Sequence, residues 1–373
     1  MVLYFNPSCE MAVRHDGMSY SAPRLVAKME EDLGVLMAYV GRAGDCVVGG
    51  RPDDELVGRL GEWGLVCDFV SVEEGRQRVE RGEEFVPWGM SRAALWTFGL
   101  RDRARSWGWR ELLSRRTSVM VEDALGEMVG VGMDAGARVI SGVGELESYR
   151  GAGGVVVKSL WSASGRGVRF FGDVDEARGY VERCIAADGG VVVERKLERV
   201  GERSLLYGVG DEGVAYVGVN EYRSGEGGGF GREIVGGGDL GVDWRWWGDM
   251  VGRALWRVIG GRGYRGAVGV DCMVYRDVEG RVRVRGCMEV NVRYCMGHVA
   301  RVVSGLMGEG VVGEWGIVRV GGDGEWDSYC ARMGEEYPLV MDADGRVRSG
   351  FVRLSGLGRG VRFGACGVFG ERK

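Results

Sequence analysis

The sequence contains few of the residues on which several kinds of active site depend. Its 373 residues include two histidines, four lysines against 45 arginines, and three asparagines. The nine cysteines are scattered and never form Cys-x-x-Cys, so they do not indicate a zinc or iron–sulfur site. We expect reduced, mostly buried thiols. No Ser/His/Asp or Cys/His arrangement indicates nucleophilic catalysis either.

Strong charge of one sign and long hydrophobic runs are also lacking. The net charge is −5, which provides no basic field to recruit nucleic acid. No stretch approaches the roughly 18 apolar residues of a membrane helix, and the opening Met1 to Phe5 is too short for a signal-peptide core. We therefore expect a cytoplasmic protein without a nucleic-acid or membrane partner. Its length and 45% apolar content favour two or three domains.

The hydrophobic periodicity changes along the chain. Short strands and helices alternate through the first hundred residues, which predicts an open parallel α/β sheet. From about residue 117 we expect a small α+β lobe, and from residue 202 strands of antiparallel character. The strands expected in these three regions are 2–5, 47–48 and 69–70; then 137–140, 155–158 and 191–194; then 204–208, 214–219, 269–275 and 281–292. A further hairpin is expected around 343–345 in the tail.

Three polar side chains occupy alternate positions near residue 290, in Glu289-Val290-Asn291-Val292-Arg293. In a strand such side chains share one face. The turn at 277–280 pairs this segment with the strand that carries Asp271, which brings the carboxylates together. Carboxylate and amide oxygens beside a guanidinium suit a magnesium-bound phosphate, although an alternating polar face can also simply face solvent.

A lysine precedes a Gly/Ser loop in the expected small lobe. Lys158 follows three valines, and Ser162-Ala163-Ser164-Gly165-Arg166-Gly167 comes next. Because lysine is scarce here, one at the end of a strand is informative. The loop's backbone N–H groups and hydroxyls suit phosphate oxygens, although no P-loop motif occurs anywhere.

The order of these motifs resembles the ATP-grasp superfamily. A strand ending in Lys158 precedes the Gly/Ser loop, a second strand ends in Glu194-Arg195-Lys196-Leu197, and the strand with Asp271 is hairpinned to Glu-x-Asn-x-Arg. Biotin carboxylase and D-alanine:D-alanine ligase show the same order. The resemblance implies an α/β and α+β architecture, an ATP-grasp fold with an N-terminal open α/β (pre-ATP-grasp) domain. The implied parts are 1–114, a small lobe 115–193 and a large lobe 194–373.

The resemblance also implies roles for individual residues. Catalysis falls to Lys158 and Arg293, and the metal ligands are Asp271, Glu289 and Asn291. The family commonly carries a second phosphate-binding lysine where this chain has Ser114-Arg115-Arg116-Thr117, so Arg116 is the candidate there. Glu202 is implied to hold the ribose. The remaining nucleotide contacts implied are Lys158, Ser162, Ser164, Gly165 and Gly167 at the phosphates, and the backbone groups of Glu194, Arg195, Lys196 and Leu197 at the adenine.

The activity implied is that of an ATP- and Mg²⁺-dependent carboxylate–amine ligase. A small-molecule or peptide carboxylate is activated as an acyl phosphate, and an amine or similar acceptor then attacks it. Two alternatives stay open: a small-molecule kinase with the same clamp, and a nucleotide-binding regulatory protein without turnover, which the absent second lysine suggests. The motifs do not identify the substrates, and they assign no role to His15 or His298.

Overall fold

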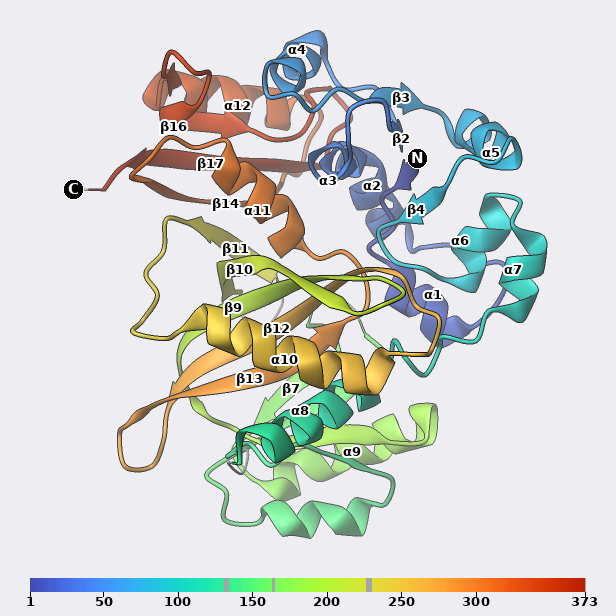
Figure 1. Ribbon diagram of the computed structural model, residues 1–373, viewed down its shortest axis with the longest axis vertical. Coiled ribbons are helices and arrows are strands. Elements are labelled where there is room, and N and C mark those ends of the chain that lie inside the picture. Colours follow the sequence, from blue (N-terminus) through green and yellow to red (C-terminus); the bar gives the residue numbers. More distant parts are fainter. Residues whose placement is uncertain (131–133, 163–164, 226–229, 373) are drawn as a thin grey trace. The chain divides into compact units, whose positions relative to one another are not determined.

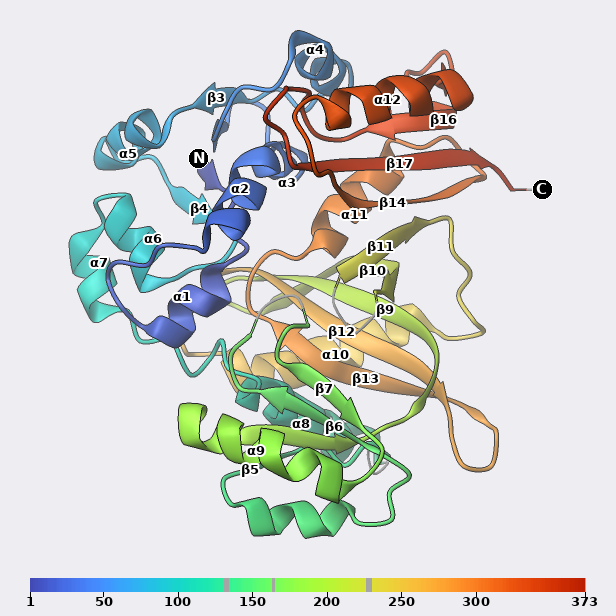
Figure 2. The ribbon, with the colours of Figure 1, turned by 180° about the vertical axis from the view of Figure 1, so that it is seen from behind.

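The protein is described by a computed structural model that covers residues 1–130, 134–162, 165–225 and 230–372. Its contacts divide the chain into two compact units (Figures 1 and 2). The first unit comprises Met1–Trp107, Gly231–Gly238 and Cys295–Lys373, and the second comprises Gly108–Phe230 and Asp239–Tyr294. The boundaries expected after residues 114 and 193 stay a prediction.

The first unit begins with a four-stranded parallel sheet. Its order is β3-β2-β1-β4, with β1 (Val2–Tyr4) paired to both β2 (Cys46–Val48) and β4 (Phe85–Pro87), and with β3 (Asp68–Val70) at one edge. The expected open parallel α/β sheet is therefore confirmed. The helices of this region are α1 (Cys9–His15), α2 (Arg24–Asp32), the short η1 (Gly34–Leu36) and α3 (Met37–Val40), α4 (Asp54–Glu62), α5 (Val72–Glu80), α6 (Arg92–Thr97) and α7 (Arg101–Ser106).

The first unit also contains an antiparallel set of strands from later in the chain. Their order is β11 (Phe230–Val235), β14 (Val311–Arg319), β17 (Phe363–Glu371), β16 (Val347–Arg353) and β15 (Val340–Met341). Helix α12 (Glu325–Glu336) buries Trp326 against this sheet, and α11 (Met296–Gly305) precedes β14. The β15–β16 pairing confirms the hairpin expected around 343–345.

The second unit contains a small antiparallel sheet of order β5-β8-β6-β7. Its strands are β5 (Arg138–Ile140), β6 (Val155–Ser159), β7 (Val168–Phe171) and β8 (Val191–Arg195). Helix α9 (Val174–Asp188) packs on one face together with η2 (Val143–Tyr149), as Figure 2 shows, and the alternate valines of β6 and β8 supply the core. Lys158 and Glu194 lie on the opposite face of these strands because their valine neighbours point into that core.

A larger antiparallel sheet of the second unit carries Asp271 and Glu289. Its order is β13 (Val282–Asn291), β12 (Gly266–Arg276), β9 (Glu198–Val209) and β10 (Val214–Ser224). The antiparallel character expected after residue 202 is confirmed. Helices α8 (Arg116–Val129) and α10 (Trp244–Ile259) cover one face, where Val268, Val270 and Cys272 of β12 join the core (Figure 1). Alternation therefore turns Asp271 toward the other face.

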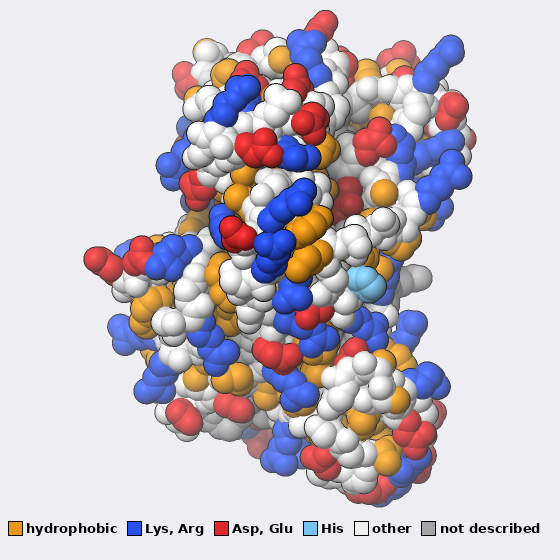
Figure 3. All heavy atoms as spheres, turned by 90° about the vertical axis from the view of Figure 1, so that its right-hand side faces the viewer, with side chains coloured by type: hydrophobic (Ala, Val, Ile, Leu, Met, Phe, Trp, Pro, Cys, Tyr) orange, Lys and Arg blue, Asp and Glu red, His pale blue; other side chains and the backbone are white. Residues whose placement is uncertain are grey.

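The distribution of surface charge and the state of the cysteines agree with what the composition indicates. On the face drawn in Figure 3, basic and acidic side chains are interspersed, in keeping with 49 basic and 54 acidic residues. No helix among the described residues combines the length and the apolar character needed to cross a membrane. None of the nine cysteines forms a disulfide; eight are buried and Cys67 is partly exposed, so the expectation of reduced, mostly buried thiols is confirmed.

Candidate active site

Asp271 and Glu289 lie directly opposite each other in the β12–β13 hairpin. The turn at residues 277–280 fixes this register, since the Asp277 backbone N–H donates to Arg281 and the Asp277 carboxylate accepts from the backbone of Glu279 and Arg281. The strand register slips after Asp271, at a bulge before Met273. The expectation that the hairpin brings the two carboxylates together is confirmed.

Hydrogen bonds fix the side chains around Asp271. Ser204 Oγ donates to Asp271 Oδ1 at 2.6 Å, and Asn291 Nδ2 donates to Asp271 Oδ2 at 3.0 Å. Arg293 Nη2 donates to Asn291 Oδ1 at 3.0 Å. One expectation needs correction, because β13 ends at Asn291 and the Arg293 N–H closes a turn onto the Asn291 carbonyl. Arg293 thus joins the cluster through a turn, although the sequence suggested one continuous strand.

The two carboxyl groups have different proton affinities. Burial, with the negative charge of Glu289 in addition, raises the pKa of Asp271 to about 6. Burial also opposes ionisation of Glu289, but the positive charges of Arg115 and Lys158 outweigh it and lower the pKa of Glu289. The acid pair is partly buried, with the Glu289 side chain 22% exposed, and additional positive charge there would favour the ionised state of both carboxylates.

Arg115, and not its neighbour Arg116, contacts the acid pair. Arg115 Nη2 lies 2.9 Å from Glu289 Oε1, and its Nη1 donates to the Ser159 carbonyl and to Ser162 Oγ. Arg116 begins helix α8 and directs its guanidinium toward Gly190. The structure therefore brings Arg115 to the cluster and leaves Arg116 away from it. The sequence placed two arginines here but could not show which side of the helix start would face the strands.

Lys158 reaches the same region from β6. Its Nζ lies 2.9 Å from Glu194 Oε1 and donates to the Met288 carbonyl at 3.3 Å. The side chain is 7% exposed. An ammonium group has three N–H donors, and these two contacts occupy two of them.

The described residues at the two ends of the loop after β6 lie in close contact with β6 and Arg115. The first serine of this loop, Ser162, accepts from Arg115, while Gly165 adopts φ +70° and accepts from the Val168 N–H. Gly167 has no room for a side chain, because a Cβ there would lie 2.0 Å from Ser159 Oγ and 2.3 Å from Ser162 Oγ. Ser164, also expected to contact phosphate, lies outside the described residues.

The segment expected to read adenine follows directly from β8. The Glu194 side chain points back to Lys158, while Arg195 and Lys196 are exposed and their N–H groups donate to the carbonyls of Ala135 and Gly154. Leu197 is half-buried. The Glu194 carboxylate is bound to protein partners, so any contact of this segment with the base is left to its backbone groups, as the resemblance implies.

Glu202 lies on the face of β9 that also carries Ser204, two residues further on. It is buried, and its carboxylate accepts from the Ser224 N–H and hydroxyl and pairs with Arg199. Tyr222 of β10 lies opposite Glu202 in the strand register. Burial, with Asp271 and Glu202 nearby, raises the pKa of the Tyr222 hydroxyl. Sequence reasoning missed Ser204 and Tyr222, although the pairing of β9 with its neighbours would have indicated both.

A magnesium ion fits the donors that converge here. Two carboxylates are hard ligands, and Asn291, whose Nδ2 contacts Asp271 and whose Oδ1 accepts from Arg293, lies beside them. Burial and the negative charge of Glu289 raise the pKa of Asp271, and a cation would offset both effects. Among the described residues no group of three or more His, Cys, Asp or Glu side chains is arranged to hold a metal ion. Mg²⁺ that is bound together with phosphates usually takes only one or two carboxylate ligands from the protein.

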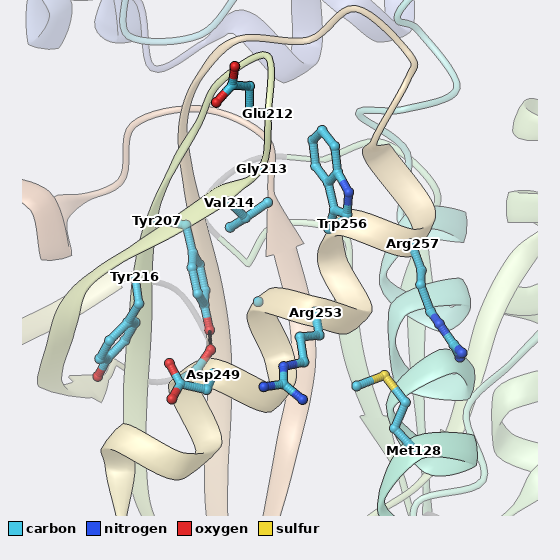
Figure 4. A pocket seen from close by; sticks show the side chains of 12 residues that line it. Met128, Tyr207, Glu212, Gly213, Val214, Tyr216, Asp249, Arg253, Trp256 and Arg257 are labelled. Carbon is cyan, nitrogen blue, oxygen red and sulfur yellow. Dashed lines mark hydrogen bonds between the residues drawn. The ribbon is translucent and has the colours of Figure 1, made fainter.

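A separate cavity of about 650 Å³ lies on the helix-covered side of the large sheet (Figure 4). Its walls include Tyr207, Tyr216 and Trp256, with Asp249 and Arg253 of α10 pointing into it. Tyr207 and its core neighbours face α10, so this cavity is separated from Asp271 by the sheet itself.

Comparison with known proteins defines the fold. No family model and no curated protein matches the sequence. Solved structures give the chain the ATP-grasp fold, and the resemblance expected from the motif order is confirmed at that level.

Three of these structures span most of the chain. The biotin carboxylase–beta-gamma-ATP complex from Campylobacter jejuni shares 14% identity at a TM-score of 0.54, covering 100% of this chain and 88% of that one. N5-carboxyaminoimidazole synthetase from Staphylococcus aureus, complexed with ADP, shares 11% at 0.51, covering 100% and 93%. The biotin carboxylase domain of 2-oxoglutarate carboxylase from Hydrogenobacter thermophilus, complexed with MgADP, ADP and bicarbonate, shares 13% at 0.52, covering 85% and 83%.

Proposed function

We propose that this chain is an ATP- and Mg²⁺-dependent ligase that activates a carboxylate for attack by an amine or a similar nucleophile. The observation that carries this proposal is the convergence of Asp271, Glu289 and Asn291 with the cations Lys158 and Arg115. The similar solved structures support it, since they are complexes with ADP, beta-gamma-ATP or MgADP. Positioning and charge neutralisation account for most catalysis of phosphoryl transfer, which needs no side-chain nucleophile.

Each group of residues in the candidate site would bind a different part of the Mg-ATP complex. Lys158, Arg115 and Arg293 would hold the phosphates and offset the charge that develops at the transferred group. The Ser162–Gly167 loop would cover the phosphates, the backbone at Leu197 would read the base, and Glu202 would hold the ribose. Asp271, Glu289 and Asn291 would bind Mg²⁺, which neutralises phosphate charge when it is bound. The nucleotide-holding lobes are then 115–193 and 194–373, after an N-terminal domain of 1–114.

The proposed reaction proceeds in two steps. A substrate carboxylate oxygen attacks the γ-phosphorus, the bond from that phosphorus to the β–γ bridging oxygen breaks, and ADP leaves. The amine then attacks the acyl carbon, phosphate leaves with the bonding pair, and the nitrogen loses a proton. The carboxylate substrate would be a small molecule or a peptide.

Asp271→Asn tests the proposal, because it removes the carboxylate but keeps the size of the side chain. We expect Mg-ATP turnover, measured as ADP release across a panel of carboxylates and amines, to fall at least about a hundredfold. Asp249→Asn, an exposed change on α10, is the matched control and should leave turnover unchanged. Wild-type turnover in the Asp271→Asn chain would contradict the metal assignment. Release of free phosphate with a new amide distinguishes the ligase from a kinase, which would leave a stable phosphoester.

A second candidate function is nucleotide binding without turnover. Arginine, rather than the family's common lysine, supplies the second cation, and Arg115 is bound to Glu289, one of the proposed metal ligands. Mg-dependent ATP binding with no ADP formation across the panel would favour this alternative.

A further inference from the structure

Four buried side chains of alternating charge connect helix α8 to Lys158. Arg285 of β13 contacts both oxygens of Glu122 of α8, with Nε–Oε1 2.7 Å and Nη2–Oε2 2.8 Å. The same Nη2 lies 2.9 Å from Glu194 Oε2, and Glu194 Oε1 lies 2.9 Å from Lys158 Nζ. Each of these side chains is 3 to 7% exposed. We call these four residues the buried charge network.

Stability alone does not explain such a network. Removing charges from water costs several kcal/mol per ion, and well-packed apolar residues of similar size usually serve a core as well or better. The network is also more extended than a single ion pair for Lys158 would require. A planar guanidinium held on one edge by two carboxylate oxygens has a fixed orientation, and here it presents the second N–H of Nη2 to Glu194.

The contacts transmit this orientation to Lys158. Glu194 divides its carboxylate between two cations, so Arg285 carries part of the attraction that would otherwise fall on the ammonium alone. Burial disfavours the Glu194 carboxylate, yet Arg285 and Lys158 outweigh it and lower the pKa of Glu194 to about 2. The second acceptor of Lys158, the Met288 carbonyl, lies on the same strand as Arg285. Both acceptors of the ammonium are therefore fixed by elements that Arg285 joins.

We propose that Arg285 and Glu122 are positioning residues that hold the Lys158 ammonium, through Glu194, where it meets the phosphates of the nucleotide. The proposal rests on the proposed function, and it gives the Glu194 carboxylate a task at the phosphate end of the site. Arg285 and Glu122 touch no reacting atom themselves.

Arg285→Met leaves two buried carboxylates short of a partner, so it should lower stability as well as nucleotide affinity. Glu122→Leu combined with Arg285→Met removes one charge of each sign and should restore much of the stability measured by urea unfolding. Calorimetric titration of the full chain with Mg-ATP should nevertheless show about tenfold weaker binding in this double variant. Its affinity for adenosine, which has no phosphate, should match the wild type. A general structural defect would weaken both ligands alike.

A mutant cycle adds the second readout. In a Lys158→Met background, Arg285→Met should weaken Mg-ATP binding no further, because both changes remove the same contact. Arg283→Met, an exposed arginine on the same strand, is the matched control and should bind Mg-ATP as the wild type does. Wild-type Mg-ATP affinity in the stable double variant, or additive losses in the cycle, would overturn the positioning role while leaving the proposed function intact. Failure of the wild-type chain itself to bind Mg-ATP would overturn both.

Discussion

Arg115 and Arg116 are adjacent in the chain but have different surroundings. Arg115 lies at the N-cap of α8 with its side chain 6% exposed, and it pairs with Glu289. Arg116 is the first residue of the helix proper, and its guanidinium lies near Gly190. Consecutive helical residues point about 100° apart, so only one of the two can face the acid pair.

This difference gives a matched pair of variants. Arg115→Ala should weaken Mg-ATP binding about tenfold or more, because it removes a buried cation beside Glu289. Arg116→Ala should change binding less than about twofold. Isothermal titration calorimetry measures both. A larger effect at Arg116 would favour the assignment made from the sequence and would give Arg115 a purely structural role.

Asp271 predicts an unusual dependence of stability on pH. Its pKa is about 6 in the folded chain against an ordinary value of 3.8, so the folded state retains a proton that the unfolded state has released. The stability of the ligand-free chain should therefore fall as pH rises from 3.8 through 6. Mg²⁺ with ADP should restore stability above pH 6 and have little effect well below it, since the cation needs the carboxylate. Thermal unfolding measured across this pH range tests the prediction. The Asp271→Asn variant should not show this fall of stability with rising pH.

The residues of the candidate site differ in how far the sequence could reveal them. The positions of Lys158, Asp271, Glu289 and Asn291 follow from strand alternation and one hairpin turn, both of which are local patterns. Arg285 and Glu122 are separated by 163 residues, and nothing local distinguishes them from solvated helix and strand residues. Tertiary packing alone selects such pairs.

At the scale of elements, helix α4 is joined to the end of β16 by a carboxylate–guanidinium pair. Arg353 donates to both oxygens of Asp53, at 2.6 and 2.9 Å. Asp53 also caps α4 through the Leu56 N–H and accepts from the Leu357 N–H. Burial opposes ionisation here, but Arg353 and Leu357 outweigh it and lower the pKa of Asp53 to about 2.

Asp53→Ala should therefore lower the free energy of unfolding by about 1–3 kcal/mol at neutral pH, a range reduced because the Asp53 side chain is partly exposed. The contribution is present above the ordinary pKa of 3.8 and is lost as pH falls toward about 2. Urea unfolding at neutral and acid pH measures both effects. Asp54→Ala, which alters an exposed neighbour, is the control and should be nearly neutral. Equal losses at both positions would contradict the pairing argument.

Several elements of the second half were not expected from the sequence, including α12 and β17. Glycine obscures the periodicity of β17, which reads Phe-Gly-Ala-Cys-Gly-Val-Phe-Gly-Glu. The structure explains one of these glycines, because a Cβ at Gly364 would lie 2.2 Å from the Trp326 ring. Close packing against a large aromatic residue favours glycine in a strand that its propensity would otherwise weaken. Sequence patterns therefore work best where valine and isoleucine mark the strand.

At the scale of the whole molecule, the fold class and the family resemblance could be predicted because the motifs occur in a fixed order. The sequence could not predict which segments make up each of the two compact units. Residues 231–238 and 295–373 belong to the same unit as the N-terminal sheet. The two segments of the second unit, 108–230 and 239–294, separate these three parts in the sequence. Such an arrangement depends on long-range strand pairing, which leaves no periodic trace in the chain.

This interleaving has a consequence for biosynthesis. The ribosome synthesises all residues of the second unit, up to Tyr294, before it begins the last segment of the first unit. The first unit therefore stays incomplete until Cys295–Lys373 has been synthesised, although all four strands of its N-terminal sheet are made early. During that interval the apolar surfaces that the last segment will cover are exposed, which makes the nascent chain a natural client for chaperones.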